Sequence, residues 1–186
     1  MIFIEDTEKK KPDEPTKPTE PILPYQFGSG QNKNRYAEEL MFIDPARIFN
    51  MYERMNENQI KGQKNLLHLH LDWMIAQSHK MEPTAICPHC QENPVKYFRV
   101  EWYYPDNRKL DHVACETCKN ILKYSPEEDK IRKINFETIA RFNNPQNSGA
   151  YQNALDILFW AYKLKNGVSA QELFELFKRA NTAPSE

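Results

Sequence analysis

The chain has 186 residues, with 25 Lys and Arg against 26 Asp and Glu and a formal net charge of −1. This balance argues against a surface that attracts nucleic acid over its whole extent, although a local basic patch would fit it. No stretch approaches the roughly 18 uncharged apolar residues of a membrane span, and the opening MIFIEDTEKKK lacks the apolar run of a secretory signal. We expect a cytoplasmic protein in a reducing compartment, with no membrane partner.

Residues 1–30 are predicted to form an extended arm. Proline recurs at every third position between residues 12 and 24, which places these prolines on one edge of a polyproline II helix. At about 3.1 Å per residue this spacer would reach roughly 40 Å. Apolar clusters lie before and after it, so the segment suits an arm along a protein partner, with a solvated, disordered tail as the alternative. The residues assigned to partner binding are Ile2, Phe3, Ile4, Pro12, Pro15, Pro18, Pro21, Ile22, Leu23 and Pro24.

Residues 31–83 are predicted to be helical, as two helices or one interrupted helix. Asp44 is a good N-cap, and the proline after it suits the first helical position. Apolar residues follow at helical spacing, and Gly62 predicts a break. His68 and His70 invite a metal-ligand interpretation, but on a helix they point about 200° apart, so a structural or surface role is expected.

All four cysteines stand in two CxxC pairs, CPHC and CETC, separated by 24 residues. Two such pairs supply four thiolates, the ligand set of a closed tetrahedral zinc site with Zn–S distances of about 2.3 Å. Disulfides are disfavoured because no signal sequence leads to an oxidising compartment, and a thioredoxin-like centre lacks its βαβ setting. We predict one structural Zn²⁺, with iron as an alternative, bound by Cys87, Cys90, Cys115 and Cys118.

The residues between the cysteine pairs are predicted to form a β-hairpin. Alternation along KYFRVEWY predicts a strand, PDNR is a turn sequence, and KLDHVAC returns as the second strand. CETCKNILKY then indicates a short helix with the second cysteine pair in its first turn. A CxxC turn (a zinc knuckle) followed by a hairpin and a helix resembles the treble-clef group of zinc domains. The resemblance covers residues 84–124, and a zinc ribbon is the near alternative. Those families often carry glycine after each knuckle, where this chain has Gln91 and Lys119.

Aromatic and basic side chains around the hairpin suggest a nucleic-acid-binding alternative. Residues 87–133 contain nine Lys or Arg and eight Asp or Glu, a smaller excess than a phosphate-tracking module usually has. Tyrosines beside arginines could still stack single strands, and DKIRKI indicates a basic helix after the module. The candidate residues are Tyr97, Arg99, Trp102, Tyr103, Arg108, Lys109, Lys130, Arg132 and Lys133.

The stretch LDHVACETCKN also resembles HNH nucleases superficially, through its Asp-His pair. In that family the pair lies well upstream of the second cysteine pair, whereas only two residues separate His112 from Cys115. No second histidine follows on the predicted helix to hold a catalytic metal ion. We therefore expect His112 to be a hairpin residue or a hydrogen-bond donor to a cysteine sulfur.

Residues 125–186 are predicted to be helical and to end in a two-helix hairpin. Ser125 begins a helix through SPEEDKI. AYQNALDILFWAYKLKNG is a strong helix ending at Gly167, and its apolar positions run almost all round, which is typical of a central or partner-sharing helix. VSAQELFELFKR follows, with a capping box from Ser169 to Glu172.

These patterns predict a mainly α-helical fold with a small zinc-bound β-hairpin module inserted between a helical segment and a C-terminal helical hairpin. No Ser-His-Asp set, Gly-rich phosphate loop or open metal site stands out, so neither an enzyme nor a small-molecule substrate is expected. The leading hypothesis is a non-catalytic zinc-binding adaptor or structural subunit of a larger assembly, contacting protein partners through the arm and aromatic surfaces. The alternatives are a DNA- or RNA-binding regulator using the hairpin and the basic helix and, more remotely, an HNH-like nuclease.

Overall fold

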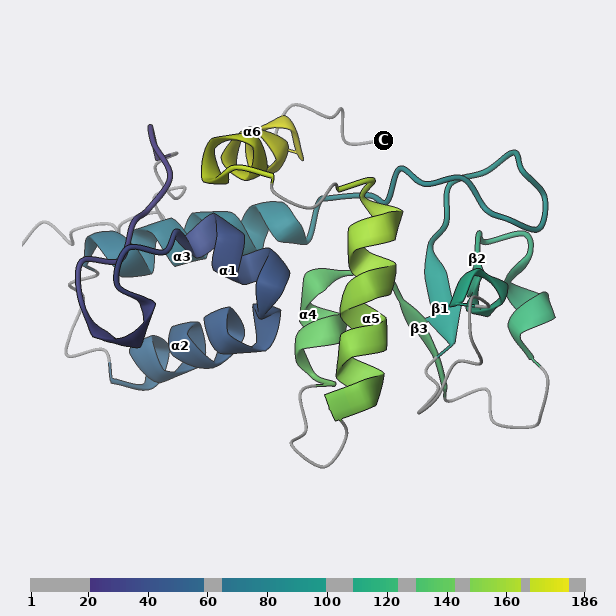
Figure 1. The fold of residues 1–186 in the computed structure, drawn as a ribbon, viewed down its shortest axis with the longest axis horizontal. Helices are drawn as coiled ribbons and strands as arrows, with labels where there is room; N and C mark the ends of the chain where they lie inside the picture. Colours follow the sequence, from purple (N-terminus) through teal and green to yellow (C-terminus); the bar gives the residue numbers. More distant parts are fainter. Residues whose placement is uncertain are drawn as a thin grey trace, which may run out of the picture.

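The computed structural model describes residues 21–58, 65–99, 109–123, 130–142, 148–164 and 168–180. Its elements are η1 (Gly30–Asn32), α1 (Ala37–Ile43), α2 (Pro45–Glu57), α3 (Leu66–Ser78), β1 (Tyr97–Arg99), η2 (Lys109–His112), β2 (Val113–Ala114), η3 (Lys119–Leu122), β3 (Ile131–Lys133), α4 (Phe136–Ala140), α5 (Ser148–Ala161) and α6 (Ala170–Ala180), where η denotes a 3₁₀ helix. The predicted mainly helical class is confirmed. Helices lie at one end and the small sheet at the other, with α4 and α5 between them (Figure 1). None of the described helices is long and apolar enough to cross a membrane.

The predicted cap at Asp44 begins α2, and a second cap that was not predicted begins α3. The Asp44 carboxylate accepts a hydrogen bond from the amide of Arg47 at 3.3 Å, which caps α2. Asn65 caps α3 in the same way, by accepting from the amide of His68 at 2.8 Å. The predicted break between the two helices is confirmed, because α2 ends at Glu57 and α3 begins beyond it. Gly62 itself lies outside the described residues.

The end of α5 differs from the prediction. The helix ends at Ala161, before Gly167, which lies outside the described residues. Lys163 takes the left-handed conformation with φ of 54° that glycine usually supplies at a helix end. The amides of Lys163 and Leu164 then donate to carbonyls of the last helical turn, each at 3.0 Å. This hydrogen-bonded stop satisfies the terminal carbonyls without a glycine, so the glycine signal was misleading.

The capping box of α6 is confirmed, but the predicted helical hairpin is wrong. The Ser169 amide donates to Glu172 Oε2 at 2.9 Å. The packing partners of α6 are α1 and α3, above which it is drawn in Figure 1, rather than α5. Phe174 of α6, for example, packs on Trp73 of α3 with ring centroids 5.2 Å apart. The buried aromatic side chains of α6 pack against helices that are distant in the chain. Local sequence does not reveal such contacts.

The sheet has three short antiparallel strands in the order β2-β1-β3. Tyr97 at the start of β1 pairs with Ala114 on one side and with Lys133 on the other. Two sequence predictions are corrected here. Most of the predicted second hairpin strand is the 3₁₀ helix η2, and the predicted basic helix from Ser125 is replaced at Ile131–Lys133 by β3. The central strand β1 offers hydrogen bonds on both edges, and β3 satisfies the edge that β2 leaves unpaired.

One apolar core runs from the helical segment into the cysteine module. It includes Phe27, Trp73 and Phe177 from the helical part, together with Cys87 and Cys115 from the module. The backbone joins the two parts as well, because the amides of residues 84 and 85 both donate to the carbonyl at the end of α5 at 2.9 Å. The cysteine module is therefore packed onto the helices instead of standing apart from them.

Candidate metal centre

The first cysteine pair lies on a tight turn between two hydrogen-bonded positions. The Cys87 amide donates to the carbonyl of Asn93 at 2.8 Å, and the Gln91 amide donates back to the Cys87 carbonyl at 2.9 Å. Gln91 closes the turn with φ of 57°, in the left-handed region. It therefore adopts the conformation that makes glycine common at this position in zinc knuckles, and the turn forms without one.

Replacing Gln91 with glycine is expected to stabilise the metal-loaded chain by up to about 1 kcal/mol. The left-handed conformation strains a non-glycine residue by roughly 1–2 kcal/mol, and glycine loses about 0.5–1 kcal/mol through its larger backbone entropy. Urea unfolding at saturating metal would measure the difference. Glu92→Gly is the matched control; its φ is not positive, so it should destabilise. Equal destabilisation by both glycines would show that the backbone at residue 91 is not left-handed.

The second cysteine pair lies between β2 and η3. Cys115 directly follows β2, and Cys118 directly precedes η3, a four-residue 3₁₀ helix that begins at Lys119. The predicted helix with both cysteines in its first turn is therefore wrong. The loop between the cysteines is pinned to the sheet instead, because the Tyr97 hydroxyl donates to Glu116 Oε2 at 2.6 Å. Glu116 and burial raise the pKa of Tyr97, which keeps this hydroxyl a donor.

The structure brings the four predicted metal ligands together. Their Sγ atoms all lie within 4.8 Å of one another, and Sγ of Cys90 and Cys115 are 3.7 Å apart. A tetrahedral zinc ion with Zn–S bonds of about 2.3 Å requires Sγ atoms about 3.8 Å apart. Cys87 and Cys115 are buried, and Cys90 and Cys118 are half-buried. No other group of three or more His, Cys, Asp or Glu among the described residues could hold a metal ion, and His112 is not part of this one.

Hydrogen bonding and burial act in opposite directions on the two outer thiols. The backbone amides of Asn93 and Glu92 lower the pKa of Cys90 to about 6. Burial, followed by the neighbouring cysteines, raises the pKa of Cys118. The Cys118 thiol therefore keeps its proton at neutral pH unless a cation stabilises its thiolate. Metal binding at this site should release protons and weaken as the pH falls.

The residues assigned to nucleic-acid binding are divided between the interior and the surface. Tyr97 and Arg99 are only 7% and 5% exposed, and the Arg99 guanidinium donates to the Leu122 carbonyl at 2.8 Å. Neither can join an exposed stacking platform. Arg132 and Lys133 are exposed on β3. The remaining candidates are Lys130, which is half-buried, and Trp102, Tyr103, Arg108 and Lys109, whose side chains lie outside the description.

The two histidines of α3 are buried and contact different partners, as their helical spacing predicts. His68 Nε2 lies 2.8 Å from Asn56 Oδ1. His70 Nε2 lies 2.6 Å from Glu38 Oε1, and the second oxygen of that carboxylate accepts from the Tyr25 amide at 3.3 Å. Glu38 is 0% exposed. Nothing in the local sequence pattern links a glutamate on α1 to a histidine on α3, so this buried pair was not predicted.

The described residues at the end of the arm change from exposed to buried between Leu23 and Phe27. Ile22 and Leu23 are 87% and 67% exposed. Phe27 is buried, and its amide donates to the Arg35 carbonyl at 2.9 Å. Six of the residues assigned to partner binding lie outside the described residues: Ile2, Phe3, Ile4, Pro12, Pro15 and Pro18. The arm thus joins the core after Pro24, and two large apolar side chains remain exposed just before this anchor.

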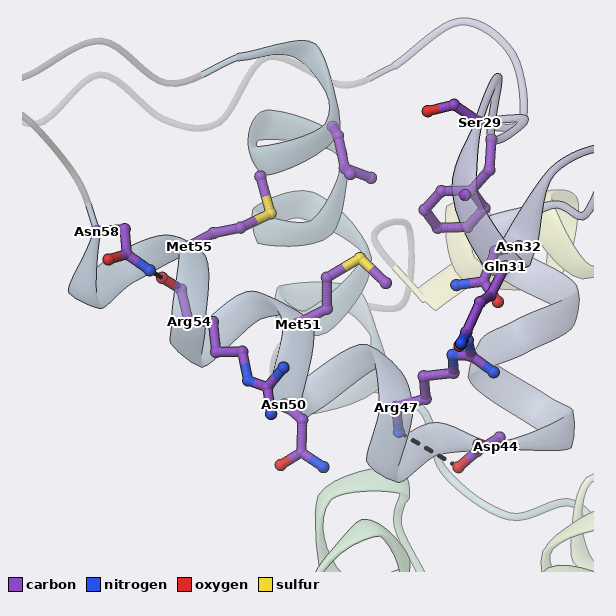
Figure 2. A pocket seen from close by; sticks show the side chains of 13 residues that line it. Ser29, Gln31, Asn32, Asp44, Arg47, Asn50, Met51, Arg54, Met55 and Asn58 are labelled. Atoms are coloured by element: carbon purple, nitrogen blue, oxygen red, sulfur yellow. Dashed lines mark hydrogen bonds between the residues drawn. The ribbon is translucent and has the colours of Figure 1, made fainter.

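A pocket of about 750 Å³ between residues 27–32 and α2 was also not predicted. Figure 2 shows that Arg47, Met51, Arg54 and Met55 of α2 line it. Their spacing places them on one face of a helix. That spacing was the available signal, but apolar and basic residues mixed on one face do not distinguish a pocket wall from a solvated surface.

No family model, curated protein or solved structure matches the chain. The assignment of the metal centre rests on the cysteine geometry itself.

Proposed function

We propose that the chain is a non-catalytic, zinc-binding adaptor or structural subunit of a larger assembly, and that its arm contacts a protein partner. The observation that carries this proposal is the cysteine cluster, in which four thiols converge and Cys87 and Cys115 belong to the apolar core. Four thiolates fill a tetrahedral coordination sphere and leave no position for a substrate, which is typical of structural sites. Zinc is the metal that best suits this ligand set, and a reducing compartment would keep the thiols available.

A treble-clef-like arrangement of the module is part of the proposal. The first pair closes with a left-handed residue, Gln91, as a zinc knuckle does. The second pair leads directly into η3, and the antiparallel strands β1 and β2 lie between the pairs. This asymmetry favours a treble clef over a ribbon built from two similar knuckles.

Deleting residues 1–24 is expected to weaken assembly while leaving the fold and the metal content unchanged. Exposed Ile22 and Leu23 would be lost, whereas the Tyr25 amide and the buried Phe27 ring, which hold the chain to the core, would remain. Quantitative co-purification of tagged full-length and truncated chains measures assembly, and circular dichroism with metal analysis measures the fold. A full-length Ile22→Ser, Leu23→Ser variant tests the two side chains alone. Unchanged co-purification of the truncated chain would contradict the role of the arm.

Among the described residues, Arg132 and Lys133, which are exposed on β3, favour a second candidate function, binding of DNA or RNA. Fluorescence anisotropy with single- and double-stranded DNA and RNA at low and near-physiological salt discriminates between the two. Micromolar binding that weakens steeply with salt and is lost in Arg132→Ala, Lys133→Ala would favour the regulator. No binding at low salt would favour the adaptor.

A further inference from the structure

The pocket beside α2 combines an apolar wall with a basic rim. Phe27, Met51 and Met55 contribute apolar surface, and Arg47 and Arg54 supply two positive charges from the same face of α2 (Figure 2). Its volume of about 750 Å³ lies within the roughly 300–1,000 Å³ usual for ligand sites. Methionine side chains adapt their shape to varied apolar partners. The pocket therefore suits a ligand with bulky apolar groups next to negative charge.

The charges of the pocket are poised for an anionic partner. Arg47 Nη2 donates to Gln31 Oε1 at 2.8 Å, which holds the guanidinium without neutralising it. The carboxylate of Asp44 also lies at the pocket, where it accepts from the Arg47 amide at 3.3 Å and the Tyr151 hydroxyl at 3.0 Å, so the lining holds two arginines against one aspartate. Within the described ranges, neither Arg47 nor Arg54 forms an ion pair with a carboxylate.

A buried polar group in the pocket wall also lacks a partner. Asn32 is 8% exposed, and its Oδ1 has no hydrogen-bond partner among the described residues. Its side chain lies beside Gln31 and Arg47 (Figure 2). A buried acceptor without a donor is unfavourable. A peptide ligand, which carries N–H groups along its backbone, could supply the missing donor.

The chain itself contains a segment with this chemistry. Ile2, Phe3 and Ile4 are bulky and apolar, and Glu5 and Asp6 follow them directly. We propose that this segment of one copy docks in the pocket of a second copy, with its apolar side chains against the methionines and its carboxylates at the two arginines. The inference rests on the proposed function, since it uses the arm as a contact, and it names a second copy of the chain as a partner.

The lengths of the two parts of the arm favour docking of residues 2–6 on a second copy over docking in the chain's own pocket. The nine residues from Pro12 to Pro21 would span roughly 28 Å as polyproline II, at about 3.1 Å each, and the described backbone bends after them at Ile22 and Leu23. The eight residues from Ile4 to Pro12 reach back at most about 28 Å, at about 3.5 Å each. The wall of the chain's own pocket begins at Phe27, just beyond the proline spacer. If the spacer takes this form, docking in the chain's own pocket would require those eight residues to run back fully extended along it, whereas docking on a second copy requires no such reversal. Reciprocal exchange between two copies would give a symmetric dimer.

Sedimentation velocity of the full-length, metal-loaded chain over a concentration series tests the proposal. We expect a reversible dimer that weakens with added salt. Arg47→Glu, Arg54→Glu should raise the dimer dissociation constant at least about tenfold, because like charges then face each other across the contact. Glu5→Lys, Asp6→Lys should do the same, and combining the two sets should restore dimerisation to within about threefold of the original. Arg132→Glu, at the far sheet, is the matched control and should leave the dimer unchanged.

Several outcomes would overturn the inference. The first is a chain that stays monomeric at every concentration. The second is a dimer whose dissociation constant is unchanged by either set of charge reversals. The third is a dimer that is weakened by each set but does not recover when the two sets are combined. If the arginine variants lose helicity, Ile2→Ser, Phe3→Ser, Ile4→Ser provides the same test without altering the pocket, and an unchanged dimer would then be the contradicting result. If the chain stays monomeric but deletion of residues 1–24 still weakens co-purification, only this inference fails and the proposed adaptor role stands.

Discussion

The Cys115→Ser chain is expected to lose its metal and, with it, the cooperative stability of the helices. Apparent binding free energies of structural zinc sites are about 10–16 kcal/mol, whereas a whole domain is stable by only about 5–15 kcal/mol. Cys115 is 1% exposed and lies in the same apolar core as Trp73 and Phe177. Losing the metal would therefore release packing that the helices share.

The measurement is thermal unfolding followed by circular dichroism at a helical wavelength, with metal content determined on the same samples. A chelator should lower the midpoint of the wild-type chain and leave the Cys115→Ser chain unchanged, because that chain has no metal to lose. Cys118→Ser, at a half-buried position, should lose metal with a smaller additional packing penalty. Helices that melt at the same temperature with and without metal would show that the two parts of the core are energetically independent.

His70→Phe is expected to destabilise the fold by about 3–5 kcal/mol, because it leaves the buried Glu38 carboxylate without its side-chain partner. Phenylalanine keeps an aromatic ring against Tyr25 and Trp73, whose centroids lie 5.6 and 5.7 Å from that of the histidine. The substitution therefore removes the 2.6 Å hydrogen bond while retaining most of the packing. Urea unfolding at neutral pH gives the free-energy difference.

The matched control is His79→Phe, at the end of the same helix. His79 Nε2 lies 3.3 Å from Glu137 Oε2, but their side chains are 49% and 37% exposed. An exposed pair of this kind contributes about 0–1 kcal/mol. The double variant Glu38→Met, His70→Phe should recover much of the lost stability, since neither buried polar group remains. Similar losses at His70 and His79, or no recovery in the double variant, would contradict the role of burial.

The features predicted correctly from the sequence are those determined by residues close together in the chain. A CxxC spacing presents two sulfurs to one ion, so the convergence of the four cysteines could be predicted before any fold was known. Asp44 and Ser169 each satisfy amides of the following helical turn, and both helices begin where these caps predict. A strand around Phe98 was also predicted, from the alternation along KYFRVEWY, but all three residues of β1 are buried and the predicted alternation of faces is not seen in their burial.

The features that could not be predicted depend on partners distant in sequence. Ile131–Lys133 is too short to show a strand period, and it becomes a strand only because β1 has an unpaired edge. The position of α6 depends on rings contributed by α1 and α3, such as that of Trp73. The Glu38–His70 contact joins residues 32 positions apart, and the pocket needs α2 to meet the loop at Phe27. None of these contacts leaves a local sequence signature.

The position of β3 in the sheet determines how the cysteine module can be used in protein engineering. All four cysteines lie between residues 87 and 118, but the third strand of their sheet comes from Ile131–Lys133, directly before α4. A graft limited to residues 84–124 would carry every ligand and still expose one edge of β1, which invites pairing with another chain. The smallest portable unit therefore extends through Lys133. During synthesis, the ligands emerge before the strand that completes their sheet.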